Sequence, residues 1–128
     1  MSDEITVTCG VRLANGDLDD ANIGPYSYTI DQNTAKPVRV GGSQIVGFAA
    51  HEAIDIAGLT TLGVAYLRNR DPAGGNFFEV GVDVGGTFYP LLRFNPGERF
   101  PLRFAQGITP YMQADTADVI VQREIFDD

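Results

Sequence analysis

The sequence contains one histidine, His51, and a search for catalytic chemistry begins there. Glu52 and Asp55 follow it closely, so this segment offers an imidazole and two carboxylates for acid–base or metal chemistry. A catalytic histidine also needs a nucleophile and an orienting group that the fold holds beside it. Ser27 and Ser43 lie in turn-like segments without the nucleophile-elbow motif. We therefore interpret His51 as a structural or solvated residue.

Acidic residues cluster near the N-terminus. Asp17, Asp19 and Asp20 offer carboxylate oxygens, which are the ligands that calcium prefers. The segment lacks the glycine and the distal glutamate that an EF-hand loop requires at fixed offsets. A solvated acidic turn is the favoured interpretation of Asp17 to Asp20, with a cation site as the alternative.

Two glycine-rich stretches, Gly41-Gly42-Ser43 and Gly85-Gly86-Thr87, could be compared with phosphate-binding loops. Such loops lie between a strand and a helix, and the first N–H groups of the helix bind the anion. Neither stretch has that context. We therefore predict a protein that is not an enzyme, with no catalytic residue, cofactor or metal; a small hydrolase that depends on His51 is the least favoured alternative.

The longest stretch of alternating apolar residues in the sequence runs from Phe77 to Phe104, and we interpret it as the centre of the fold. Wherever a strand is plausible, the even positions are apolar and the odd positions are more polar, which is the period of a β-strand with one dry face. We interpret the stretch as three consecutive antiparallel strands of one meander. The even positions are Phe78, Val80, Val82, Val84, Phe88, Pro90, Leu92, Phe94, Phe100, Leu102 and Phe104.

The first turn of this stretch is predicted to be a three-residue loop, Gly85-Gly86-Thr87. A loop of that length pairs Val84 with Phe88 and Val80 with Leu92, so the apolar residues stay on one face. A two-residue Gly85-Gly86 loop would place even positions opposite odd ones. The apolar pattern therefore favours the longer loop.

The second turn, Asn95 to Arg99, has Pro-Gly at its centre and is predicted to form a type II turn. Its five residues should keep Phe94 opposite Phe100. Pro90 and Pro101 cannot donate a main-chain hydrogen bond, so they predict edge strands, bulges or outward-facing positions.

Short β patterns recur about every ten residues outside this stretch. Residues 17–23 are expected to form an acidic loop or a helical turn, and residues 49–56 a helical turn. In the last strand, apolar residues occupy both faces, which predicts burial on both sides or an interface. Further strands are expected at residues 5–13, 26–30, 38–40, 45–48, 62–67, 107–114 and 118–126.

Eight or nine short strands without a long amphipathic helix predict an all-β protein. We expect a single antiparallel β-sandwich or jelly-roll-like domain over residues 1–128. A chain of 128 residues is long enough to bury a core without a disulfide or metal. Cys9 is the only cysteine, so no intramolecular disulfide can form, and a reducing site of synthesis is expected.

The formal net charge of −8 argues against binding to nucleic acid or to an anionic membrane, because both would repel the molecule. No segment approaches the roughly 20 apolar residues of a membrane span. The first residues do not form a secretion signal. We expect a soluble protein made in a cytoplasm.

Four tyrosines stand near strand ends or on the wetter face: Tyr26, Tyr28, Tyr89 and Tyr111. A carbohydrate-binding platform would place tyrosines there, and so would a protein interface, which is rich in tyrosine. The chain has no tryptophan, which weakens the carbohydrate hypothesis.

Four segments of the C-terminal half form a recognisable pattern: Glu79–Leu92, Asn95–Glu98, Ala114–Ala117 and Glu124–Asp128. In these segments the chain resembles small structural proteins of tailed bacteriophages. The resemblance implies a β-sandwich component of the virion that is made in the host cytoplasm. The role that it favours most is that of a capsid decoration (cement) protein. Such a protein would bind the major capsid protein on the capsid surface and would assemble as a homo-oligomer, with a trimer favoured.

Two alternatives accompany this interpretation: a tail or head–tail adaptor component, and a carbohydrate- or host-surface-binding module. The candidate contact residues are Phe77, Tyr89, Leu91 and Tyr111, which are expected to lie off the main apolar face. They could equally cover a second sheet of the same subunit.

Overall fold

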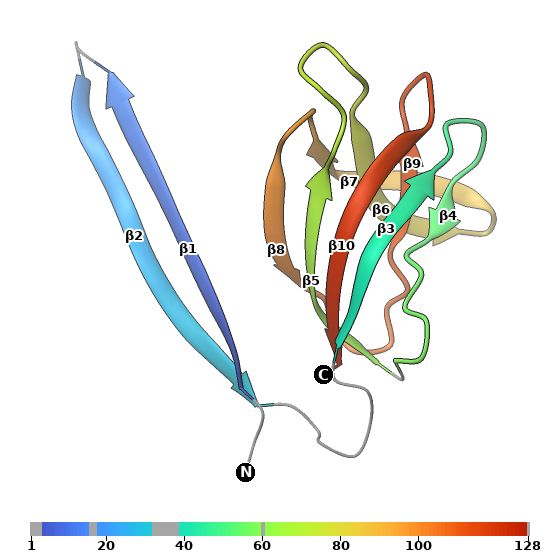
Figure 1. Ribbon diagram of the computed structural model, residues 1–128, viewed down its shortest axis with the longest axis horizontal. Helices are drawn as coiled ribbons and strands as arrows, with labels where there is room; N and C mark the ends of the chain where they lie inside the picture. The colour runs from blue at the N-terminus through green and yellow to red at the C-terminus, as the bar shows by residue number, and fades with distance from the viewer. Residues whose placement is uncertain (1–3, 16–17, 32–38, 60, 128) are drawn as a thin grey trace. The chain divides into compact units, whose positions relative to one another are not determined.

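The structure, a computed structural model, describes residues 4–15, 18–31, 39–59 and 61–127 (Figure 1). The chain divides into two compact units, Met1–Thr34 and Ala35–Asp128. The first contains a two-stranded ribbon and the second contains a β-sandwich, and no helix occurs in the described ranges. That residues 1–128 form one domain stays a prediction.

The ribbon consists of β1 (Glu4–Asn15) and β2 (Leu18–Asp31), which pair antiparallel. The strands predicted at residues 5–13 and 26–30 are confirmed. The loop or helical turn predicted for residues 17–23 is wrong from Leu18 onward, because β2 already pairs with β1 there. Asp17 and the side chains of Asp19 and Asp20 lie outside the described part, so the predicted acidic turn or cation site is not described.

The sandwich contains two antiparallel sheets of four strands each (Figure 1). The first, here called the β10 sheet, has the order β3 (Arg39–Val46), β10 (Val119–Asp127), β5 (Leu62–Asn69) and β8 (Arg99–Arg103). The second, the β6 sheet, has the order β4 (Glu52–Ala53), β9 (Tyr111–Ala114), β6 (Phe78–Val84) and β7 (Thr87–Phe94). The predicted all-β sandwich is confirmed.

The core lies between the two sheets and is filled by alternate residues of their strands. In β10, Val119, Val121 and Ile125 are fully buried and Ile120 is exposed on the other face, as the alternation predicts. At the centre, the rings of Phe78 and Phe94 stack at 4.8 Å between centroids. The other fully buried apolar side chains of the core cluster include Val46, Ala65, Leu67 and Met112.

The predicted three-stranded meander is wrong at its third strand. β6 pairs with β7, but β8 crosses to the other sheet and pairs with β5. Phe94 and Phe100 are therefore not ladder partners; their rings meet edge to face at 5.1 Å. A period of two shows which side chains face a core, but the pattern is the same whichever sheet the strand joins.

A buried asparagine holds this crossing in place. Asn69, the last residue of β5, donates from Nδ2 to the carbonyl oxygens of Phe94 and Asn76, each at 2.9 Å. Its main-chain N–H donates to Glu98 and its carbonyl accepts from Gly97, each at 3.0 Å. The turn after β7 is thus bound to the end of β5, which directs β8 into the β10 sheet.

The predicted three-residue loop between β6 and β7 is also wrong. Val84 pairs with Thr87 across a two-residue Gly85-Gly86 loop, and a β-bulge at Leu91 absorbs the extra residue. Beyond the bulge, Val80 pairs with Leu92 as predicted. The bulge thus restores the register that the longer loop was expected to give.

The bulge changes which residues share a face. Phe88 pairs with Asp83, so it lies on the outward face of the β6 sheet and not with the core residues as predicted. Pro90 pairs with Gly81 and likewise faces outward. β7 and β8 end their sheets, so the prediction of edge strands for Pro90 and Pro101 is confirmed.

Two further sequence predictions are wrong. Residues 49–56 form bends and the short strand β4 instead of a helical turn. Residues 39–40 and 45–46, which were expected in separate strands at 38–40 and 45–48, belong to one strand, β3, because pairing with β10 continues through Gly41 and Gly42.

Gly81 is required by the bulge, and its substitution tests the register. A Cβ at this position would lie 2.0 Å from the carbonyl oxygen of Tyr89. Gly81→Ala should therefore lower the free energy of unfolding by about 1–3 kcal/mol, as overpacking does. Chemical denaturation measures it.

Gly58→Ala is the control, because a Cβ there meets nothing within 4 Å. It should change stability by less than about 0.5 kcal/mol. Equal stability of the two variants would contradict the bulge geometry.

Candidate functional site

The only histidine of the sequence forms a hydrogen bond with Asp83 through Nε2. Asp83 lies at the end of β6, and Phe88 of β7 stacks on the imidazole at 5.5 Å between centroids. The ring of Tyr111 from β9 meets the imidazole edge-on at 5.5 Å. His51 thus ties the loop before β4 to three strands of the β6 sheet on its outward face.

The carboxylate of Asp83 is fully engaged by its neighbours. Oδ2 pairs with His51 and Oδ1 accepts a hydrogen bond from the N–H of Gly86 at 3.0 Å. The His51 hydrogen bond, and then the Gly86 hydrogen bond, hold the pKa of Asp83 below its ordinary value of 3.8. Exposed fractions of 20% for His51 and 23% for Asp83 leave the pair in contact with solvent.

Neither acidic neighbour of His51 in the sequence contributes to this cluster. Glu52 accepts a hydrogen bond from the N–H of Gly47, and Asp55 pairs with Arg123. The predicted structural interpretation of His51 agrees with an imidazole that is packed between two aromatic rings. Sequence inspection missed the partner of His51, Asp83, which lies two residues before the Gly85-Gly86 turn and accepts a hydrogen bond from a turn N–H, as aspartate commonly does there.

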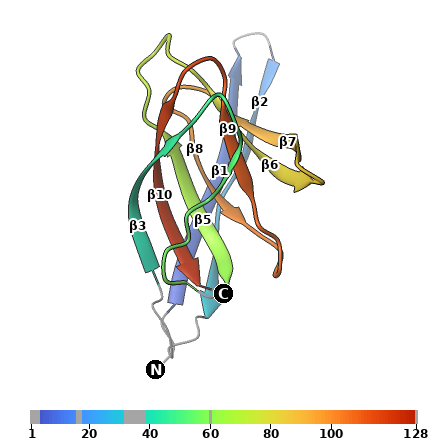
Figure 2. The same cartoon turned by 90° about the vertical axis from the view of Figure 1, so that its right-hand side faces the viewer.

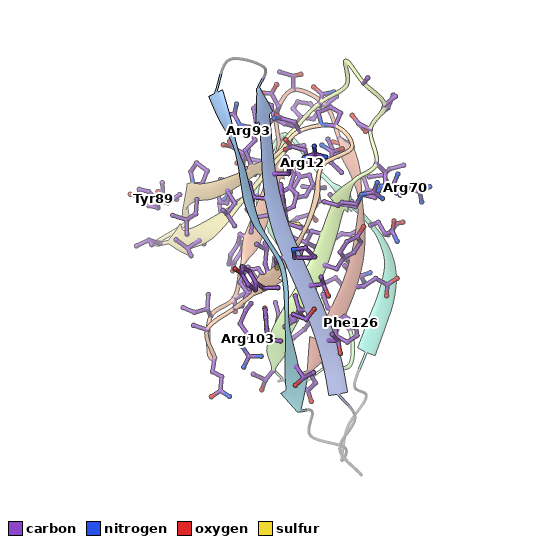
Figure 3. The ribbon with its side chains drawn as sticks, turned by 90° about the vertical axis from the view of Figure 1, so that its left-hand side faces the viewer. Arg12, Arg70, Tyr89, Arg93, Arg103 and Phe126 are labelled. Carbon is purple, nitrogen blue, oxygen red and sulfur yellow. The ribbon has the colours of Figure 1, made fainter. Side chains whose placement is uncertain are left out.

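A second candidate site is the apolar end of the β6–β7 hairpin, which projects beyond the neighbouring strands (Figure 2). We call it the projection and define it by Val84, Tyr89, Leu91 and Leu92, all of which are exposed. Leu91, the bulged residue, is the most exposed at 71%. Tyr89 marks its free end (Figure 3).

An apolar groove adjoins the projection. It has a volume of about 80 Å³ and is lined by Val80, Val82, Leu91, Leu92, Phe104, Ile108 and Pro110, with the main chain of Gly81. Ile108 and Pro110 also line a larger hollow of about 330 Å³ beside Ile54 and Leu62. The groove and the hollow together extend the apolar surface from the hairpin toward the end of the sandwich.

The four predicted contact residues do not form one surface. Tyr89 and Leu91 belong to the projection, and Tyr89 pairs with Val82, so its position off the main apolar face is a wrong prediction. Phe77 is half-buried beneath the guanidinium of Arg93, 3.8 Å above its ring. Tyr111 is half-buried against His51. Tyr26 and Tyr28 lie in the ribbon on β2.

The glycine stretches are parts of the sheets. Gly41-Gly42-Ser43 lies inside β3, and Gly85-Gly86 forms the hairpin turn. Among the side chains that the structure describes, no group of three or more His, Cys, Asp or Glu is placed to hold a metal. Within the same residues, no helix has the length and apolar character of a membrane span.

Comparison with known proteins gives no relative: no family model, curated protein or solved structure matches this chain.

The hydrogen bonds of the Asp83 carboxylate should stabilise the fold in a pH-dependent way. Its pKa is lowered by folding, so its contribution is present above pH 3.8 and is lost as the pH falls through the lower folded-state pKa. Asp83→Asn should lower the melting temperature at pH 7 and weaken its decline in acid. Calorimetry across this pH range measures both effects.

Asp115→Asn is the matched control, since it removes one exposed carboxylate from a turn. It should retain the acid decline of the unchanged chain. An Asp83→Asn protein with an unaltered acid decline would show that the His51 pair does not couple to folding.

Proposed function

We propose that this protein is a non-enzymatic structural protein of a tailed-bacteriophage virion, and that it decorates the capsid by binding the major capsid protein. The observation that carries the proposal is the projection with its adjoining apolar groove. Contiguous exposed apolar surface is costly in water and commonly marks a site that a partner covers. Binding, without turnover, is the task that such a surface supports.

The edge geometry favours contact through side chains. β7 is an edge strand, but Pro90 lacks an N–H and the bulge at Leu91 interrupts the ladder. Both features oppose the addition of a further strand. Leu91 and Leu92 can instead enter a complementary pocket of the partner, with the groove accepting an apolar side chain in return.

The strand order also supports a virion role. The two orders, β3-β10-β5-β8 and β4-β9-β6-β7, fit the pattern expected of an eight-stranded jelly roll. This architecture is common in viral capsid and lectin domains. A fold alone does not define function, so the order adds to the proposal without carrying it.

A decoration protein of this kind stabilises a shell by binding the assembled state in preference to free subunits. A trimer would present three projections, and their joint attachment would raise the effective affinity. The formal net charge of −8 would keep decorated particles repelling one another in solution.

Copy number separates the decoration role from its alternatives. Mass analysis of the assembled particle should give a number of copies comparable to that of the capsid subunits. About six or twelve copies would instead indicate a tail or head–tail adaptor ring. Saturable sugar binding, with absence from tail-less capsids, would indicate the host-surface module.

Leu91→Asp should weaken attachment to capsids about 10–100-fold, because one buried leucine is worth about 1.5–3 kcal/mol. Binding to undecorated capsids, measured by co-sedimentation, gives the change. Phe48→Asp is the control, because it also replaces an exposed apolar side chain with a carboxylate. Phe48 lies in the loop after β3, outside the projection, and is 47% exposed, similar to Leu92 of the projection at 44%. Unchanged binding by Leu91→Asp, or equal losses for both variants, would contradict attachment through the projection.

A further inference from the structure

The outward face of the β10 sheet carries an unusual pair of like charges. Arg68 of β5 lies directly opposite Arg99 of β8, so both side chains stand on the same face. Arg103, also on β8, lies on this face opposite Val64 and is labelled in Figure 3. Like charges directly opposite one another destabilise a sheet unless an opposite charge compensates them.

Compensation for this pair is missing from the described part of the chain. Neither Arg68 nor Arg99 forms an ion pair there, and Nε of Arg68 is buried without a hydrogen-bond partner. Among the described side chains on this face, the one carboxylate is Glu124, which stands opposite Tyr66. The face therefore has excess positive charge, although the whole chain has a formal net charge of −8.

Apolar and aromatic residues share the face with these arginines. By register, Phe126 pairs with Val64, and Tyr66 pairs with Pro101. Ile45 and Ile120, opposite each other on β3 and β10, are exposed. Arginine beside aromatic and aliphatic groups is typical of a protein interface. The chemistry fits a partner strand that combines acidic and apolar residues.

The ribbon of the chain has that composition. Residues 1–34 contain six acidic residues and one arginine, a formal net charge of −5. β1 alternates apolar and polar residues from Ile5 to Leu13. A two-stranded ribbon is at best marginally stable alone in water, so it needs a surface to cover one of its faces.

The length of the ribbon favours a contact between two molecules. β2 has 14 residues and spans roughly 46 Å at about 3.3 Å per residue. The longest strand of the β10 sheet has 9 residues and spans roughly 30 Å. One β10 sheet is therefore too short to cover the whole ribbon, and full coverage needs a second subunit.

We propose that the outward face of the β10 sheet binds the acidic β1–β2 ribbon of a second copy of this chain. Carboxylates of the ribbon compensate Arg68 and Arg99, and its apolar residues cover the aromatic part of the face. The contact joins copies of the protein to one another, so it is independent of what the projection binds.

Arg99→Glu tests the charge requirement in the full-length protein. The unchanged chain should self-associate, with an affinity that falls as salt is added. Arg99→Glu should weaken association at least about tenfold, because it repels an acidic partner. Arg70→Glu reverses another exposed arginine, in the loop after β5, and should have a much smaller effect. Sedimentation equilibrium measures all three proteins.

A monomeric unchanged chain, or equal effects of the two variants, would overturn the proposal. Thermal unfolding of each variant checks that the sandwich remains folded. Arg99→Gln, which removes the charge without reversing it, should give an intermediate loss. If Arg99→Gln weakened association as much as Arg99→Glu, the contact would not depend on the charge of Arg99, and the proposed charge pairing would be wrong.

A mixing experiment separates a contact between copies from one within a chain. A ribbon variant, Asp19→Lys with Asp20→Lys, should associate weakly alone, as Arg99→Glu does. An equimolar mixture should regain complexes that contain both variants, because the lysine ribbon complements the glutamate face of the other chain. Native mass spectrometry identifies these mixed complexes. A mixture that behaves as the two separate variants would show that no ribbon binds the face of a second copy.

Discussion

A buried side-chain amide fixes the connection on which the sandwich depends. Asn69 binds the carbonyl of Phe94 at the end of β7 and also the turn that leads into β8. Its position joins the edge of one sheet to the centre of the other, so the aromatic pair Phe78 and Phe94 is enclosed beneath β5 and β8. Because the amide is fully buried, its hydrogen bonds replace those with water, and an alternative course for the chain would leave it unsatisfied.

Local alternation predicted the faces of the strands but could not predict their neighbours. Val119, Val121 and Ile125 were identified as one face because burial follows a period of two within a single strand. The sheet that β8 joins depends on Asn69, 30 residues before the start of that strand, and no local pattern contains this information. The bulge at Leu91 was missed because a two-residue turn followed by a bulge gives the same pairing at the open end of the hairpin, Val80 with Leu92, as a three-residue turn.

The candidate sites show the same division between local and distant information. Exposure of Leu91 and Tyr89 was predicted from their odd positions, although the bulge sets the face on which they lie. The partner of His51 is 32 residues away in the sequence, whereas its acidic neighbours bind elsewhere. Arg68 and Arg99 meet only because two distant strands pair. The projection and the outward face of the β10 sheet should also respond differently to salt, because salt screens contacts between charges but does not screen apolar burial.

The β-bulge has a consequence for how this surface can change during evolution. Leu91 is one residue more than the ladder between β6 and β7 needs, and the pairs on either side of it are complete without it. A codon change at Leu91, which is the most exposed residue of the projection, can therefore alter the displayed side chain while every neighbouring strand pair keeps its partner. Specificity at this site can diversify without a penalty to the scaffold that displays it.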